Sequence, residues 1–340
     1  MTQLSLIPAH SDAQSALEVK ANLLLSNNQH NKRFNSCPRI SLTLLRSTVT
    51  DINRDVAATL KLCGPAVLLT DNGTVVPQLC QHLLAVITKR HPCQQDLGDE
   101  AEEEILDESS EYDWLVIETA LEAVTCLSVA LGPQFAELWK MFEKPIVKYA
   151  SSQDSTERSA AVGSIAECIG NMGAGCTPYT SGLLKLLLHR LSDEDAETKS
   201  NAVYGIGLLC EMTTNDDEIL KSLSTIFAKL EPLLDAQDQA RLLDNTAGCV
   251  SRFISKHPDK LPIAEVLPRL VNLLPLREDF EENKPVFGMI VKLYQHNEPT
   301  VQQLTPSLMP VLEKVLGPPE DQLEDETRSQ LVELVQHLRK

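Results

Sequence analysis

Polar side chains in the second half of the sequence have the types and spacing to hold an extended peptide. Asn201 and Asn245 recur at about one repeat's distance, and Glu281 and Glu282 follow one repeat later. An Asn side chain offers both a donor and an acceptor, so a column of them can bind the amides and carbonyls of an extended backbone. Two adjacent carboxylates predict an anionic pocket for a lysine ammonium. This chemistry is recognition rather than catalysis.

Each of these residue types also has a purely structural interpretation. An Asn can simply satisfy a helix end or a neighbouring side chain. The acids of Pro275-Leu-Arg-Glu-Asp-Phe-Glu-Glu-Asn283 can occupy the first turn of a helix, where its dipole favours negative charge. That explains Glu278 and Asp279, whereas Glu281 and Glu282 lie deeper in the expected helix. Both interpretations stay open at this stage.

Motifs of enzymes are absent from the sequence, and we expect no catalytic activity, no cofactor and no metal. There is no Gly-rich phosphate loop and no HExxH pair, and no His stands near a nucleophile with a third orienting group. The nine cysteines are scattered without a CxxC or Cys/His cluster. We therefore expect reduced core cysteines in a cytosolic or nuclear protein.

A repeat of glycines indicates how these side chains are positioned. Gly163, Gly205, Gly248 and Gly288 each stand in an expected helix, at steps of 42, 43 and 40 residues. This period is typical of HEAT and armadillo solenoids, which are built from stacked helix pairs. Small residues on the inner helices relieve crowding there or let a ligand approach the backbone. The sequence leaves both roles open.

Helical periodicity extends over most of the chain, and no strand-like alternation persists. The pattern predicts an all-α HEAT-repeat α-solenoid, a superhelix of about seven helix pairs. The expected inner helices cover 114–131, 156–169, 197–211, 239–255 and 279–294. The expected outer helices cover 134–150, 178–191, 217–234, 263–274 and 301–316. Helices are also expected at 12–26, 39–62, 75–90 and 321–338, the last with Asp321 and Glu324 spaced like a capping box.

The solenoid is expected to cover 38–340, after a poorly readable helix and polar loop at 1–37. Residues 96–113 hold ten acids and no Lys or Arg, which predicts a solvated loop or an attractor for a basic partner.

The N-terminus lacks a basic signal region, and no stretch is expected to span a bilayer. A formal net charge of −18 argues against direct nucleic-acid binding and favours a basic partner.

One helix shows the expected division of faces. In 243–254 the apolar residues Leu243, Ala247, Val250 and Ile254 form one stripe. The opposite face, which we expect to be concave in the solenoid, carries Arg241, Asn245, Gly248 and Arg252.

Four segments resemble the carboxy-terminal HEAT repeats of the importin-β (karyopherin-β) family of nuclear transport receptors, and within it the importin-four group of histone importers. They are Asn-Ala-Val-Tyr-Gly-Ile-Gly (201–207), Asp-Asn-Thr-Ala-Gly (244–248), Leu-Pro-Leu-Arg-Glu-Asp-Phe-Glu-Glu (274–282) and Glu-Arg-Ser-Ala-Ala-Val-Gly-Ser-Ile-Ala-Glu (157–167). The acidic run before Glu-Tyr-Asp-Trp (111–114) is also similar. Because family members are about three times as long, the resemblance implies a carboxy-terminal segment without the region that binds the GTPase Ran.

The resemblance implies a nuclear import receptor fragment that binds basic, extended segments of cargo. It implies ribosomal proteins and histones as cargo, above all the histone-three and histone-four tails, and a monomer that shuttles between cytoplasm and nucleus. The implied cargo-binding residues are Asn201, Tyr204, Asp244, Asn245, Arg252, Glu281 and Glu282. The alternative is a HEAT-repeat scaffold that holds a folded partner, such as a phosphatase or a tubulin-type subunit.

Overall fold

The computed structural model describes residues 38–94, 103–235, 238–318 and 322–340. In these ranges the regular structure is helical, with α-helices linked by short 3₁₀ turns and no strand. The chain is divided into two compact units, Met1–Gly175 and Cys176–Lys340. The expected helix at 12–26 lies outside the described residues, as does the rest of 1–37.

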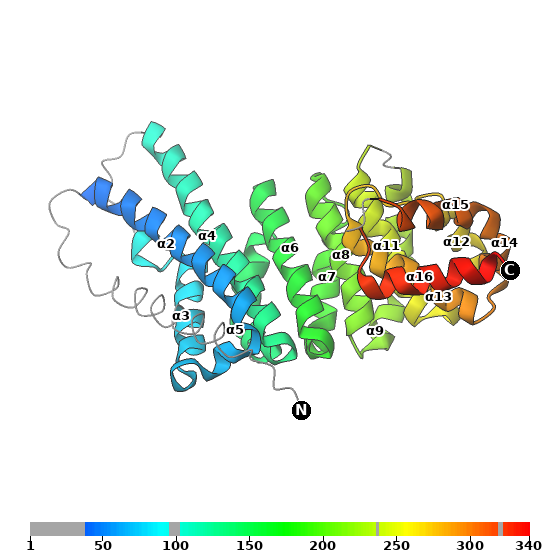
Figure 1. Cartoon of the computed structure of the whole chain (residues 1–340). Helices are drawn as coiled ribbons and strands as arrows, with labels where there is room; N and C mark the ends of the chain where they lie inside the picture. The colour runs from blue at the N-terminus through cyan, green and yellow to red at the C-terminus, as the bar shows by residue number, and fades with distance from the viewer. Residues whose placement is uncertain (1–37, 95–102, 236–237, 319–321) are drawn as a thin grey trace, which may run out of the picture. The chain divides into compact units, whose positions relative to one another are not determined.

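In the first unit, α2 (Pro38–Cys63), α4 (Glu103–Leu131) and α6 (Ser155–Met172) pack side by side in one layer. Helices α3 (Val75–Ile87) and α5 (Phe135–Tyr149) cover them from the other side (Figure 1). The fully buried rings of Phe135, Trp139 and Phe142 fill the core, with the Phe135 and Phe142 centroids 6.2 Å apart.

The second unit has the same two-layered arrangement. One layer contains α8 (Ala196–Met212), α11 (Ala240–Lys256), α13 (Asn283–Gln295) and α16 (Asp325–Leu338), each packed on the next. The other layer contains α7 (Thr180–Arg190), α9 (Asp216–Lys221), α10 (Leu223–Leu230), α12 (Ile263–Val271), α14 (Pro299–Gln303) and α15 (Thr305–Leu316). The alternation of layers follows the periodicity of the sequence.

Helix starts follow capping chemistry in two successive repeats. The Asp154 carboxylate accepts from the Glu157 amide at the start of α6, and the Asp195 carboxylate accepts from the Thr198 amide at the start of α8. Such caps satisfy amides that have no partner inside the helix.

Several expected boundaries are wrong. The helix expected at 217–234 is broken into α9, α10 and a 3₁₀ turn, and the one at 301–316 into α14 and α15. The last helix begins at Asp325 rather than at 321, and the Glu324 side chain before it makes no capping hydrogen bond. Asp321, the other residue of the expected capping box, lies outside the described residues. The acidic run is not entirely a loop, because α4 already begins at Glu103.

The sequence from Asp113 to Tyr149 is long and apolar enough to cross a membrane by length and composition. This corrects the expectation that no stretch qualifies. The apolar window of this segment is 67% buried inside the protein, so packing against neighbouring helices accounts for its composition.

Candidate functional site

Helix α11 positions the polar residues of the candidate site. Arg241, Asn245, Gly248 and Arg252 recur every three or four residues, so they share one helix face. All four meet residues of the loop and 3₁₀ turn before α13, and Arg241, Asn245 and Arg252 also reach α8. This face is therefore largely covered, rather than open as the sequence analysis expected.

The loop before α13 is fixed by the buried carboxylate of Asp244. Its Oδ2 accepts hydrogen bonds from three consecutive amides, of Arg277 at 3.0 Å, Glu278 at 2.7 Å and Asp279 at 3.0 Å. A carboxylate that receives several backbone N–H groups forms strong, charge-assisted bonds. Asp244 is thus an internal anchor that sets where the side chains of 277–282 project.

Asn245 is the central amide of the network and is only 2% exposed. Its Nδ2 donates to Ser200 Oγ at 2.9 Å and to Asp279 Oδ2 at 3.2 Å. An ionised Asp279 carboxylate can only accept, so the amide orientation is determined. The Asn245 Oδ1 atom is buried and has no hydrogen-bond partner among the described residues.

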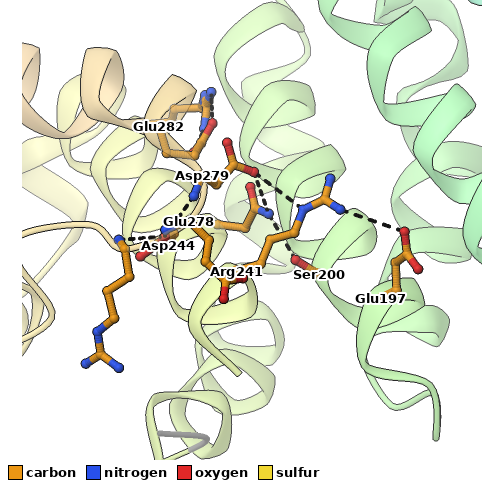
Figure 2. A network of polar contacts seen from close by, with 10 residues as sticks. Glu197, Ser200, Arg241, Asp244, Glu278, Asp279 and Glu282 are labelled. Carbon is orange, nitrogen blue, oxygen red and sulfur yellow. Dashed lines mark hydrogen bonds and ion pairs between the residues drawn. The ribbon is translucent and has the colours of Figure 1, made fainter. Parts of the chain in front are cut away.

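Arg241 bridges two carboxylates beside this amide (Figure 2). Its Nε lies 3.7 Å from Asp279 Oδ2, and its Nη1 lies 3.7 Å from Glu197 Oε1 on α8. Both distances exceed those of good hydrogen bonds. The Arg241 side chain is 52% exposed and Asp279 is 20% exposed, so these are loose ion pairs at the surface.

Arg252 makes a tight, buried cluster at the other end of α11. Its guanidinium donates two parallel hydrogen bonds to the Glu282 carboxylate, and the one from Nη2 to Oε1 is 2.8 Å long. It also donates to Glu211 Oε2 at 2.9 Å and lies 5.5 Å from the centre of the Tyr204 ring. Burial alone would lower the pKa of Arg252, but its bonds to Glu282 and the negative charge of that residue raise the pKa above its ordinary value. The arginine therefore stays protonated.

Glu281 and Glu282 do not form the joint anionic pocket that was expected from the sequence. Glu282 is 1% exposed and neutralised by Arg252, whereas Glu281 is exposed on the surface. The two carboxylates thus have different environments. Adjacent residues of a 3₁₀ turn point in different directions, which the sequence analysis did not take into account.

Two glycines of α8 and α11 make room for close packing. A Cβ on Gly248 would overlap the Glu282 carboxylate, so the glycine makes room for the buried ion pair. A Cβ on Gly207 would lie 2.9 Å from the Cys249 Cα, so this glycine lets α8 and α11 approach closely. A Cβ on Gly288, by contrast, would meet no atom within 4 Å.

Several buried or half-buried asparagines link neighbouring elements of one layer. Asn245 bonds Ser200 on the previous helix of its layer, and Asn283 donates to the Gln322 carbonyl at 2.8 Å. In the first unit Asn171 donates to Ser128 at 3.0 Å. Asn201 is itself buried. A structural role thus accounts for the Nδ2 group of Asn245. Its Oδ1 atom has no hydrogen-bond partner in the part of the chain described.

Exposed acids flank this network. Glu197 on α8 and Glu278 and Glu281 before α13 are exposed, while Asp279 is half-buried between them. From the sequence, Arg241 was expected on this face but not among the cargo-binding residues, Glu197 was not expected in the site, and Asp279 was assigned to a helix dipole. The carboxylate of Asp279 instead contacts Asn245 and Arg241, because α13 begins only at Asn283. The arrangement can attract and orient cationic side chains.

Comparisons with known proteins agree with the fold and identify the family. The model of the family "Importin subunit beta-1-like, TPR repeats" matches residues 73–204. The probable importin subunit beta-4 of Schizosaccharomyces pombe is 36% identical over 268 residues, which are 77% of this chain and 25% of that protein. Importin-4 of Homo sapiens is 31% identical over 300 residues, 87% of this chain and 27% of that protein. The chain thus spans about a quarter of the length of these relatives.

Solved structures share the HEAT-repeat fold at low sequence identity. A crystal structure of importin beta superposes with a TM-score of 0.73 at 15% identity, covering 97% of this chain and 39% of that one. The karyopherin Kap121p bound to the SUMO protease Ulp1p gives 0.62 at 14% identity, covering 95% and 28%. These structures show the fold, and the two relatives above show that the chain belongs to the importin-β family, in its importin-4 group.

Proposed function

We propose that this chain forms part of the cargo-binding surface of a nuclear import receptor and takes basic, extended segments of cargo proteins. The face in question, called here the acidic face, comprises Glu197, Glu278, Asp279, Glu281 and the amide of Asn245. The single observation that supports it is the anchored loop before α13. Asp244 holds three of its amides, which fixes exposed carboxylates beside a buried amide oxygen without a partner among the described residues.

The physical basis is electrostatic capture followed by short-range positioning. Fixed carboxylates raise the local concentration of cationic chains and need no rearrangement to receive them. The formal charge of −18 acts in the same direction. In this proposal Glu278 and Glu281 replace the Glu281–Glu282 pair expected from the sequence, because Glu282 is already neutralised. Tyr204, Asp244 and Arg252 then support the face rather than contact the cargo.

Family membership extends the proposal to the whole receptor. A member of the importin-4 group is expected to shuttle between cytoplasm and nucleus, without catalytic activity, and to carry histones or ribosomal proteins. Lysine-rich histone-three and histone-four tails suit an acidic face of this kind, and release by Ran would involve other parts of the receptor. Kap121p, which shares the fold, was solved in complex with a protein partner, the SUMO protease Ulp1p.

The test measures binding of a synthetic Lys–Gly repeat peptide of about fifteen residues, an extended length of about 50 Å, by fluorescence anisotropy. The double variant Glu278→Gln/Glu281→Gln should weaken binding roughly tenfold, as expected for removal of two contacting charges. Acetylation of every peptide lysine should do at least as much, because it removes the positive charge.

A matched control removes two exposed acids from the other layer, Asp217→Asn/Glu265→Gln. It lowers the net negative charge equally, and binding should change less than about twofold if location matters more than total charge. Equal losses in both double variants would overturn the acidic face as the binding site. Failure of the peptide to bind, together with capture of a large folded partner, would favour the scaffold alternative.

A further inference from the structure

We infer that Arg241 is an internal placeholder for a cationic side chain of the cargo, and that basic segments bind by displacing it. The inference rests on the proposed function, because it concerns the same acidic face. Arg241 lies between the carboxylates of Glu197 and Asp279, which come from different elements, and its guanidinium pairs with both.

The geometry of Arg241 suits a displaceable ligand. Its two ion pairs are each 3.7 Å long and its side chain is half-exposed. Ion pairs of this kind contribute little, because solvent screens them and the long side chain loses rotamer freedom on forming them. A competing guanidinium or ammonium can therefore replace Arg241 without disturbing the fold.

A second observation points to an incoming donor at the same place. Asp279 Oδ2 contacts both Arg241 Nε and Asn245 Nδ2, so Asn245 lies next to the position of the Arg241 guanidinium. The Oδ1 of Asn245 is buried without a donor among the described residues, and an unsatisfied buried acceptor is costly. An ammonium carries three donors, and we infer that a lysine that replaces Arg241 bonds Asp279 with one donor and turns another to Asn245 Oδ1.

The displacement of Arg241 would also explain why the proposed acidic face contains an arginine. In the unbound state Arg241 neutralises two carboxylates that would otherwise repel one another. On binding, the cargo cation takes over this role, and Arg241 turns to solvent. A cargo segment must therefore bind the carboxylates more strongly than Arg241 does. Weakly basic segments do not, so competition with Arg241 gives specificity.

The test compares Arg241→Gln with the matched control Lys284→Gln in the 340-residue chain, using the same Lys–Gly peptide. Lys284 is exposed and its Nζ pairs with Glu324 at 3.0 Å, so both variants remove one cation from the second unit. Arg241→Gln should tighten binding about three- to tenfold, the gain from no longer breaking two loose ion pairs. Lys284→Gln should change binding less than about twofold.

A double-mutant cycle separates competition from long-range charge. If Arg241 competes for Glu197, the gain from Arg241→Gln shrinks by at least half in a Glu197→Gln background, whereas distant charge effects simply add. If the wild-type chain binds but Arg241→Gln matches Lys284→Gln, the placeholder is overturned and the proposed function stands. If neither the wild-type chain nor Arg241→Gln binds the peptide, both are overturned.

Discussion

The two ends of α11 carry arginines on the same face but in opposite circumstances. Arg252 is 7% exposed and holds Glu282 through two short bonds, whereas Arg241 is 52% exposed and stands 3.7 Å from each of its carboxylates. Both link α11 to α8 and to the residues before α13. The difference shows that one helix face carries a buried link between repeats at one end and an exposed, loosely paired cation at the other, which is where the proposed binding takes place.

Burial determines which role each arginine has. A buried charge must keep its partner, because water cannot replace the lost interaction. An exposed charge exchanges partners at little cost. Arg252 and Glu282 therefore belong to the fold, whereas Arg241, Glu197 and Asp279 are the residues that we propose for binding.

The largest expected effect is on stability. Arg252→Met should destabilise the second unit by about 3–5 kcal/mol, because Glu282 is left buried and unpaired. Arg241→Met should cost less than about 1 kcal/mol. Urea unfolding followed by circular dichroism measures both. Trp114 and Trp139 lie in the first unit, so tryptophan fluorescence separates its transition from that of the second unit.

The double variant Arg252→Met/Glu282→Leu provides the control for this interpretation. Replacing both partners of a buried pair by apolar groups is often close to neutral. It should therefore recover most of the stability lost in Arg252→Met. A double variant as unstable as the single one would show that packing, rather than the unpaired charge, causes the loss.

A smaller effect is expected at the glycines of the same layer. Gly248→Ala should destabilise the second unit by about 1–3 kcal/mol, because its Cβ would displace the Glu282 carboxylate. Gly288→Ala places the same methyl group in open space on α13 and should stabilise by up to about 1 kcal/mol through helix propensity. Thermal unfolding compares the two, and equal shifts would contradict the role given to Gly248.

Much of the fold could be predicted from the sequence because each repeat has a strong local signal. The apolar stripes, the Gly period and breakers such as Gly132-Pro133 located most helices and the alternation of layers. The break inside 217–234 was missed because Ser222 stands in a helical pattern without a breaker beside it. The break inside 301–316 did have a signal, because Pro306 stands in the first turn of α15.

The site was harder to predict, because its partners come from different repeats. Periodicity placed Asn245 and Arg252 on one face of α11 but could not indicate what covers that face. The covering residues, Asp279 and Glu282, belong to a loop and a 3₁₀ turn, where helical register does not apply. The pairing of Glu282 with Arg252, 30 residues away, depends on how the loop is anchored at Asp244.

The most direct measurement is hydrogen exchange, followed by mass spectrometry, of the 340-residue chain with and without the Lys–Gly peptide. Binding at the acidic face should slow exchange in residues 276–282 and in the first turns of α8 and α11. The C-terminal half of α11, around Arg252, should be well protected in both states. Protection confined to the layer of α9, α12 and α15, or no change at saturating peptide, would contradict the account.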